Sequence, residues 1–170
     1  MAGSKFWFIG GFSDYVTSQF KSRMHIAFKK EGLDSEEYCI IHPRLSQYEF
    51  FGLAKSADII LDGIAWSGNN SSLEAMAFNK PIVTIQGKYF RSRHSSAILK
   101  RINVVETIAR NVGDYKAIAI RLGIDEGFRA KMGEAVARNK KIAYSDIDVI
   151  QGLEEFFKSV VAFNVGESKL

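Results

Sequence analysis

A short polar segment, Gly68–Ser72, precedes Glu74 and carries the most distinctive chemistry in the sequence. A glycine lets a phosphate approach the backbone, and the free N–H groups and dipole of a helix that starts here attract an anion. Glu74 would repel a phosphate placed directly above it, but its carboxylate could accept hydrogen bonds from hydroxyls beside that phosphate. A phosphate next to a diol is what a nucleotide sugar presents. The equally supported alternative is that Asn70 or Ser71 caps the helix and Glu74 merely complements its dipole.

The neighbouring elements determine where this segment would lie. The apolar run Asp58–Leu61 predicts a parallel strand buried on both faces, and Pro81 opens a second, β-branched strand at Ile82–Ile85. Between them, a helix is predicted over Ser71–Phe78. In parallel α/β sheets, ligands bind beyond the carboxyl ends of strands, where the strand order reverses. The polar segment follows such a strand end, so topology and local chemistry favour the same position.

The rest of the chain alternates in the same way. Further strands are predicted at Phe6–Ile9, Tyr38–Ile41 and, as a short strand or loop, Asn103–Val105, and further helices at Tyr15–Glu31, Gln47–Lys55, Ser92–Arg101, Asp114–Leu122, Glu126–Lys141 and Asp146–Val161. This alternation predicts a single α/β domain over residues 1–170, a Rossmann-like parallel sheet with helices on both faces. Its core is expected to include the aromatic residues Phe6, Trp7, Phe8, Phe20 and Phe28. Residues 1–4 are interpreted as a cloning remnant and residues 163–170 as a frayed tail.

Other polar residues give no catalytic assignment. His42 follows an apolar strand, but no serine or cysteine nucleophile motif surrounds it, so a structural role is favoured. Asp58 and Asp62 flank a strand, and structural roles are favoured over acid–base chemistry. The histidines are scattered and no Cys–His spacing fits zinc, so no metal site is predicted.

Two aromatic or basic features lie near the polar segment. The segment Lys88–His94 follows the strand at Ile82–Ile85, and its arginines could help to neutralise a diphosphate; an ordinary helix start is equally supported. Trp66 stands in the polar turn itself, where it could stack on a base or sugar or cover the sheet edge.

The segment Leu73–Val83 resembles the donor-binding helix and following strand of GT-B glycosyltransferases. The sequence resembles the protein O-GlcNAc transferase and Spindly group more closely, at Ala57-Asp58, Leu61-Asp62, Gly68–Glu74, Pro81–Thr84 and Ser92-Arg93. A weaker likeness to that group continues at Glu106–Ala109, Asp114-Tyr115 and Leu122-Gly123. The resemblance extends from His42 to Lys141. It implies that the chain is the carboxyl-terminal, donor-binding lobe of a GT-B fold.

The resemblance also implies roles for individual residues. Asn70 and Ser71 fall where the family usually has two threonines that face the donor diphosphate, and Glu74 falls on its ribose-binding acid. The donor-binding residues implied in this way are Gly68, Asn69, Asn70, Ser71, Ser72, Glu74 and Arg93. No catalytic residue is implied, because the acceptor-activating groups of the family belong to elements outside this sequence.

Three departures from the family pattern leave the identity of the donor open. Asn69 and Phe50 stand where O-GlcNAc transferases carry histidines. Asn79 replaces the usual glycine before Lys80-Pro81, which is tolerable because asparagine visits left-handed backbone conformations. The sugar and the nucleotide base therefore stay unassigned.

Composition excludes several other classes of protein. The chain has 170 residues, 46% of them hydrophobic, and a net charge of +4 from dispersed basic residues, so a nucleic-acid-binding face is not expected. No apolar run is long enough to span a bilayer. The single cysteine, Cys39, excludes an internal disulfide and makes a reducing, cytoplasmic location the default expectation.

These observations lead to one functional prediction and two alternatives. The resemblance implies a metal-independent, cofactor-free lobe that binds a nucleotide-sugar donor such as UDP-GlcNAc, whose leaving diphosphate is stabilised by helix N–H groups. The acceptor-binding, N-terminal lobe is not found in this sequence, so weak nucleotide binding and no turnover are expected from it alone. The alternatives are a stand-alone nucleotide-binding module and a non-catalytic protein-interaction module that keeps the lobe as scaffold.

Overall fold

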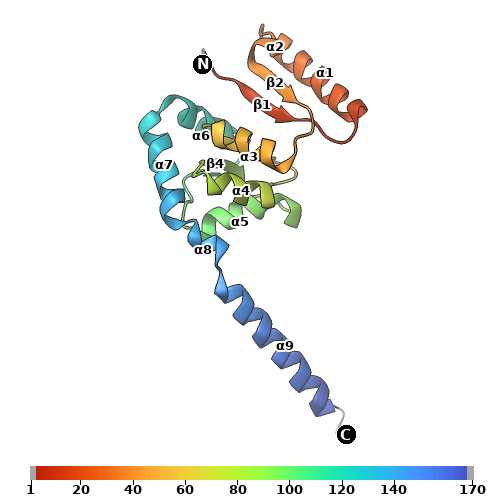
Figure 1. Ribbon diagram of the computed structural model, residues 1–170, viewed down its shortest axis with the longest axis vertical. Coiled ribbons are helices and arrows are strands. Elements are labelled where there is room, and N and C mark those ends of the chain that lie inside the picture. Colours follow the sequence, from red (N-terminus) through yellow and green to blue (C-terminus); the bar gives the residue numbers. More distant parts are fainter. Residues whose placement is uncertain (1–2, 168–170) are drawn as a thin grey trace.

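The computed structural model describes residues 3–167 and shows an α/β protein in which all strands are parallel (Figure 1). The strands are β1 (Phe6–Ile9), β2 (Cys39–His42), β3 (Ile60–Leu61), β4 (Ile82–Ile85) and β5 (Ile108–Ala109). The helices are α1 (Asp14–Lys30), α2 (Ser35–Tyr38), α3 (Gln47–Ser56), α4 (Asn70–Ala77), the 3-10 turn η1 (Phe90–Ser92), α5 (His94–Arg101), α6 (Val112–Ile124), α7 (Glu126–Asn139), α8 (Lys141–Tyr144) and α9 (Ile147–Glu167). The segments interpreted as remnant and tail lie partly outside the described residues.

The strands form two sheets where the sequence predicts one. One sheet pairs β1 with β2, and the other has the order β3-β4-β5. The break falls between the β1–β2 pair and β3, and within residues 3–167 no pairing of β3 with β1 or β2 is found.

The core surrounds β4. Ile82 and Val83 are fully buried there, and the cluster continues through helices α4 to α7, with Met76, Leu99, Leu122, Met132 and Val136 also buried. Local signals start the surrounding helices: Asn111 caps α6 and Asp125 caps α7, each accepting a hydrogen bond from a backbone N–H of the first turn. The second sheet and its helices thus form the well-packed part of the molecule.

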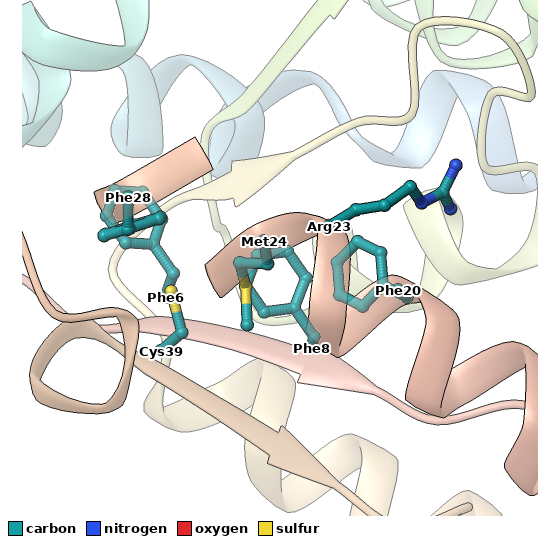
Figure 2. A pocket seen from close by; sticks show the side chains of 7 residues that line it. All are labelled: Phe6, Phe8, Phe20, Arg23, Met24, Phe28 and Cys39. Carbon is teal, nitrogen blue, oxygen red and sulfur yellow. The ribbon is translucent and has the colours of Figure 1, made fainter. Parts of the chain in front are cut away.

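The β1–β2 unit is much more open. α1 has no fully buried residue, and it covers only one face of the two-stranded sheet, where Phe8 and Phe20 pack edge to face at 5.1 Å. Neighbouring residues of a strand point to opposite faces, so Trp7 lies on the uncovered face and is 39% exposed. The expectation that the whole aromatic set is core is therefore wrong. Phe6, Phe8, Phe20 and Phe28 are only partly buried and line an open cavity (Figure 2).

One further strand was not predicted. The third strand of the second sheet lies at Ile108–Ala109, where Thr84 pairs with Ile108, and of the two possibilities predicted for Asn103–Val105, a short strand or a loop, the loop is confirmed. Asn103 adopts φ 54°, and the N–H of Val104 bonds to the Leu99 carbonyl at 2.9 Å. This is the geometry that ends a helix with a buried hydrophobic residue, so the segment closes α5.

The carboxyl-terminal helix leaves the body of the protein. Figure 1 shows α9 extending beyond α8, at the end of the molecule opposite the β1–β2 unit. Its start is held by Arg101, whose guanidinium lies 2.6 Å from a carboxylate oxygen of Asp146 and 2.6 Å from one of Asp148. The helix runs to Glu167, past the end predicted at Val161.

Candidate functional site

The polar segment singled out in the sequence lies where the topology places a ligand site. β3 ends at Leu61 and α4 begins at Asn70, so the connecting turn stands at the carboxyl end of a parallel strand. Asp62 is the first residue of this turn and is 8% exposed. The turn and the start of α4 are built around its side chain.

The carboxylate of Asp62 accepts three hydrogen bonds. One oxygen accepts from the backbone N–H of Gly68 at 2.7 Å. The other accepts from the hydroxyls of Ser67 at 2.7 Å and Thr84 at 2.6 Å. The Asp62 carboxylate thereby links Ser67 and Gly68 of the turn to Thr84 of β4, and the structural role expected for Asp62 is confirmed. Asp58, by contrast, is exposed.

Ser95, at the start of α5, joins the same network from the other side. Its N–H donates to the Ser67 hydroxyl at 2.9 Å, and its own hydroxyl donates to the Gly68 carbonyl at 3.1 Å. The Ser72 and Ser95 hydroxyls lie 2.7 Å apart, and Ser72 is 2% exposed. Ser72 was predicted to bind donor, but its hydroxyl points into this network, so its contribution is to position the turn.

Gly68 is required by close packing. A Cβ at this position would lie 2.5 Å from the Ser72 hydroxyl and 2.7 Å from the Ser71 hydroxyl. The Ser72 hydroxyl is held by Ser95, so it cannot move away without breaking the network. The residue predicted to let a phosphate approach thus also allows the turn to pack against its own helix.

The start of α4 is open above this network. Asn69, Asn70 and Ser71 are exposed, and Asn69 rather than Asn70 or Ser71 is the N-cap residue. Its side chain makes no capping hydrogen bond, so the alternative of an ordinary capped helix start is wrong. No helical carbonyl reaches the N–H groups of Asn70 and Ser71, and no hydrogen bond to either is found within the described part of the chain.

Glu74 lies one turn further along α4. It is three residues after Ser71 and four after Asn70, so the three share one face of the helix. Its side chain is half-buried, and among residues 3–167 no ion pair or hydrogen bond to its carboxylate is found. The dipole acts mainly within the first turn, and α4 has no acidic residue there, which does not favour the interpretation of Glu74 as a dipole complement.

The basic segment that follows β4 lies against the turn. The N–H of Ser67 donates to the Arg91 carbonyl at 2.8 Å. Arg93 is exposed, and its guanidinium donates to the carbonyls of Gly87 at 2.9 Å and Lys88 at 2.7 Å. Two N–H groups of the Arg93 guanidinium therefore stabilise the loop at residues 87–93. Trp66 and Phe90 project from the two loops and are 74% and 82% exposed.

No role was predicted for four members of the network: Ser67, Thr84, Ser95 and Tyr115. Thr84 and Tyr115 lie in segments that carry the family resemblance, and the available signal for the network was an acid directly after a strand, followed by small hydroxyl residues. The Tyr115 hydroxyl donates to the Asp62 carbonyl oxygen at 2.8 Å. Burial, and then the negative charge of Asp62, raise the pKa of Tyr115 to about 12, so its hydroxyl stays protonated as a donor.

His42 lies away from the turn. The ring of His42 packs edge to face on Trp7 at 6.0 Å, in the β1–β2 unit, rather than on the turn. Within residues 3–167, no three His, Cys, Asp or Glu side chains gather in a way that could hold a metal ion. None of the helices in the described part of the chain is both long and apolar enough to cross a membrane.

Known proteins are similar to this chain in sequence and in fold. The model for glycosyl transferase family 41 matches residues 17–149, most of the chain. The chain belongs to glycosyltransferase family 41. A family relative from Petunia hybrida, a probable UDP-N-acetylglucosamine–peptide N-acetylglucosaminyltransferase SPINDLY, is 23% identical over 133 residues, which are 76% of this chain and 14% of the plant protein.

A solved structure of the same kind is similar over nearly the whole chain. A point mutant of the O-GlcNAc transferase of Thermobaculum terrenum matches with a TM-score of 0.76 and 27% identity, over 91% of this chain and 30% of the bacterial one. The resemblance to the O-GlcNAc transferase and Spindly group and the α/β fold class are thereby confirmed. This family 41 chain spans less than a third of either relative.

Proposed function

We propose that this chain is the donor-binding lobe of a family 41 glycosyltransferase and that it binds a nucleotide sugar at the start of α4. The observation that carries the proposal is a rigid turn with an open helix N-terminus. Asp62 and Ser95 hold Ser67 and Gly68, while Asn70 and Ser71 are exposed and no partner of their N–H groups is found among the described residues. A helix start with free N–H groups attracts phosphate oxygens through both hydrogen bonding and the helix dipole.

The ribose would lie beside Glu74. This carboxylate is half-buried, free of partners among the described residues, and one helical turn from Asn70, a rise of about 5.4 Å. A carboxylate can accept hydrogen bonds from two hydroxyls at once. One helix face therefore offers donors to the diphosphate and acceptors to the neighbouring diol, which matches the chemistry of a nucleotide sugar.

In transfer chemistry, the same groups would stabilise the leaving diphosphate. Negative charge grows on its oxygens as the bond to the sugar breaks, and N–H groups already oriented by the turn need no reorganisation. The exposed Lys88 and Arg91 of the adjoining loop add positive charge nearby. We propose that this chemistry proceeds without a metal or other cofactor.

We propose the identities of the donor and the acceptor from the relatives. The name of the Petunia protein points to UDP-N-acetylglucosamine as donor and a peptide as acceptor. Because the chain spans less than a third of either relative, the acceptor-binding lobe would lie outside these residues. We expect the 170-residue chain to bind nucleotide weakly and to show no turnover alone.

An amide NMR titration tests the proposal. UDP and GDP are added to wild type, to Glu74→Gln, and to Glu134→Gln, a control that alters an exposed glutamate on α7. We expect shifts concentrated at residues 68–74 with one of the two nucleotides, at least tenfold weaker binding in Glu74→Gln, and no change in the control. Shifts elsewhere, or equal binding by both variants, would refute the assignment of the site.

The scaffold alternative is separated by the same experiment. A scaffold lobe would show no shifts with either nucleotide. A buried structural ion pair at Glu74 would favour that alternative, and none is found among the described residues. The lack of a partner for Glu74 among residues 3–167 is thus the observation that favours nucleotide binding over a scaffold.

A further inference from the structure

Trp66 is an exposed tryptophan on a well-anchored backbone beside the proposed donor site. Its side chain is 74% exposed. A Cβ on Gly63 would lie 2.4 Å from the Trp66 carbonyl oxygen, so the turn closes tightly at this point. The next residue, Ser67, donates its hydroxyl hydrogen to Asp62 at 2.7 Å and its N–H to the Arg91 carbonyl at 2.8 Å. Because the backbone is already ordered, a ligand that contacts the indole ring pays little for ordering it.

Trp66 differs from the other exposed aromatic residues of this region in its surroundings. The ring of Phe90 packs edge to face on His94, with 4.7 Å between the ring centroids. The Arg91 guanidinium lies over the ring of Tyr89, 4.9 Å from its centroid. Within the described part of the chain, no such aromatic or cationic partner of Trp66 is found. Its ring is therefore the one that is available to a ligand.

The order of the groups in a nucleotide sugar decides which of them can reach Trp66. The base is attached to the ribose, the diphosphate follows the ribose, and the sugar is attached to the outer phosphate. In the proposed site, the diphosphate lies at the N–H groups of Asn70 and Ser71, and the ribose lies beside Glu74, one turn further along α4. The base therefore continues beyond the ribose, away from the start of the helix. The sugar leaves the diphosphate on the opposite side.

That opposite side is formed by the turn before α4 and the loop after β4. Trp66 stands four residues before the first residue of α4, and the bond from Ser67 to Arg91 joins the turn to the loop. For the base to reach Trp66, the nucleotide would have to run in the reverse direction, with its ribose away from Glu74. The position of Glu74 thus favours the sugar over the base as the group that meets the indole ring.

The chemistry of the two rings also fits. The face of an aromatic ring carries partial negative charge, and the C–H groups on the face of a pyranose ring are apolar and slightly positive, so the two faces attract each other. Tryptophan adds an indole N–H that can donate a hydrogen bond to a sugar hydroxyl. A rigidly held tryptophan therefore suits a hexose in its pyranose form.

We propose that Trp66 is the stacking platform of a hexose subsite and determines the preference for a nucleotide sugar over the free nucleoside diphosphate. The inference rests on the proposed donor site and deepens it. The ligand class is a nucleoside diphosphate linked to a pyranose with an accessible C–H face. Truncation of Trp66 removes the contact to the sugar and leaves the N–H groups of Asn70 and Ser71 to bind the diphosphate.

Amide NMR titration of the full 170-residue chain with UDP and with UDP-GlcNAc tests the proposal. In wild type we expect UDP-GlcNAc to bind about fivefold more tightly than UDP, the size of one aromatic contact. The indole N–H signal of Trp66 should shift with UDP-GlcNAc more than with UDP. Trp66→Ala should abolish the difference in affinity without weakening UDP, whereas Trp66→Phe, which keeps an aromatic ring, should retain most of it. If GDP is the nucleotide that binds, GDP and GDP-mannose replace this pair.

Tyr15→Ala is the matched control, because it removes an exposed aromatic side chain from α1, in the β1–β2 unit. It should leave both affinities unchanged. Equal losses of UDP and UDP-GlcNAc affinity in Trp66→Ala would assign Trp66 to the base or to the turn itself and overturn the inference.

Equal affinities of wild type for the two ligands, or a preference that Trp66→Ala leaves intact, would also overturn it. The latter result is expected if Trp66 only covers the sheet edge or packs against another part of the protein. Nucleotide binding would stand in all of these cases. Absence of binding by every ligand would instead refute the proposed donor site, and this inference with it.

Discussion

The carboxylate of Asp62 is expected to contribute more to the stability of the second sheet than any other polar side chain of the turn. Asp62→Ala removes the acceptor for three donors: the Gly68 N–H and the hydroxyls of Ser67 and Thr84. The Ser67 hydroxyl has another neighbour in Ser95, 3.0 Å away. The Gly68 N–H and the Thr84 hydroxyl have no replacement among the described contacts, and a buried unsatisfied donor costs about 1–3 kcal/mol.

These costs determine the expected change in the free energy of unfolding. Two unsatisfied donors give about 4 kcal/mol, and removal of a buried charge recovers some desolvation energy, so we expect a net loss of about 3 kcal/mol in the free energy of unfolding. Asp62→Asn keeps one acceptor oxygen for Gly68 and turns an NH₂ toward the two hydroxyls, which can also accept. The Ser67 hydroxyl can still donate to Ser95, but the Thr84 hydroxyl loses its only acceptor among the described contacts, so we expect a loss of about 2 kcal/mol.

Urea unfolding measures these differences by linear extrapolation. All variants carry Trp7→Phe, which leaves Trp66, in the turn itself, as the only tryptophan. Asp58→Ala, at an exposed aspartate of the same strand region, is the control and should change stability by less than about 0.5 kcal/mol. If Asp62→Ala costs no more than Asp58→Ala, the network does not support the turn and the reasoning is refuted.

Three further predictions concern the same architecture. Gly68→Ala should destabilise the protein by about 2 kcal/mol and abolish the nucleotide-induced shifts, because its Cβ would meet the Ser72 hydroxyl at 2.5 Å; unchanged urea unfolding would contradict this. Tyr115, with its pKa raised to about 12, should stabilise the fold fully below pH 10 and lose that contribution as the pH rises through 12. Tyrosinate absorbance and unfolding at high pH measure this loss. Tyr115→Phe should remove the late titration step, and a step that persists would belong to another tyrosine. In hydrogen exchange, amides of residues 6–42 should exchange much faster than those of β4, because a two-stranded sheet with one covered face is marginally stable alone; equal protection of the two sheets would show that they unfold together.

Much of the secondary structure was readable from local patterns. The strands at Phe6–Ile9 and Ile82–Ile85 were predicted with their observed ends, since β-branched and aromatic runs bounded by Gly or Pro are strong signals. For Asn103–Val105 the local pattern left both a short strand and a loop open, because its valines have strand propensity. The loop conformation follows from the left-handed Asn103 and from burial of Val104 at the end of α5, a tertiary effect.

The position of the candidate site was also predictable, but its internal construction was not. A polar turn after a buried strand indicates the carboxyl edge of a sheet, where Gly68–Glu74 is found. The sequence did not distinguish Ser71, which is exposed, from Ser72, which is buried and bonded to Ser95. Adjacent serines at a helix start differ by 100° of rotation, and the position of α5 decides which of them faces inward.

The sequence by itself indicated the family through the resemblance at residues 57–93, and it indicated the parallel α/β class through the order and periodicity of its segments. The same order predicted that the polar turn stands at the carboxyl edge of the sheet. Only the tertiary structure decided that the strands divide into two sheets and that Thr84 and Ser95 reach Asp62. It alone also showed that the apolar residues of α9, among them Phe156 and Phe157, are exposed in this chain. These features join residues far apart in the chain, or depend on the absence of a neighbour, and neither leaves a local pattern in the sequence.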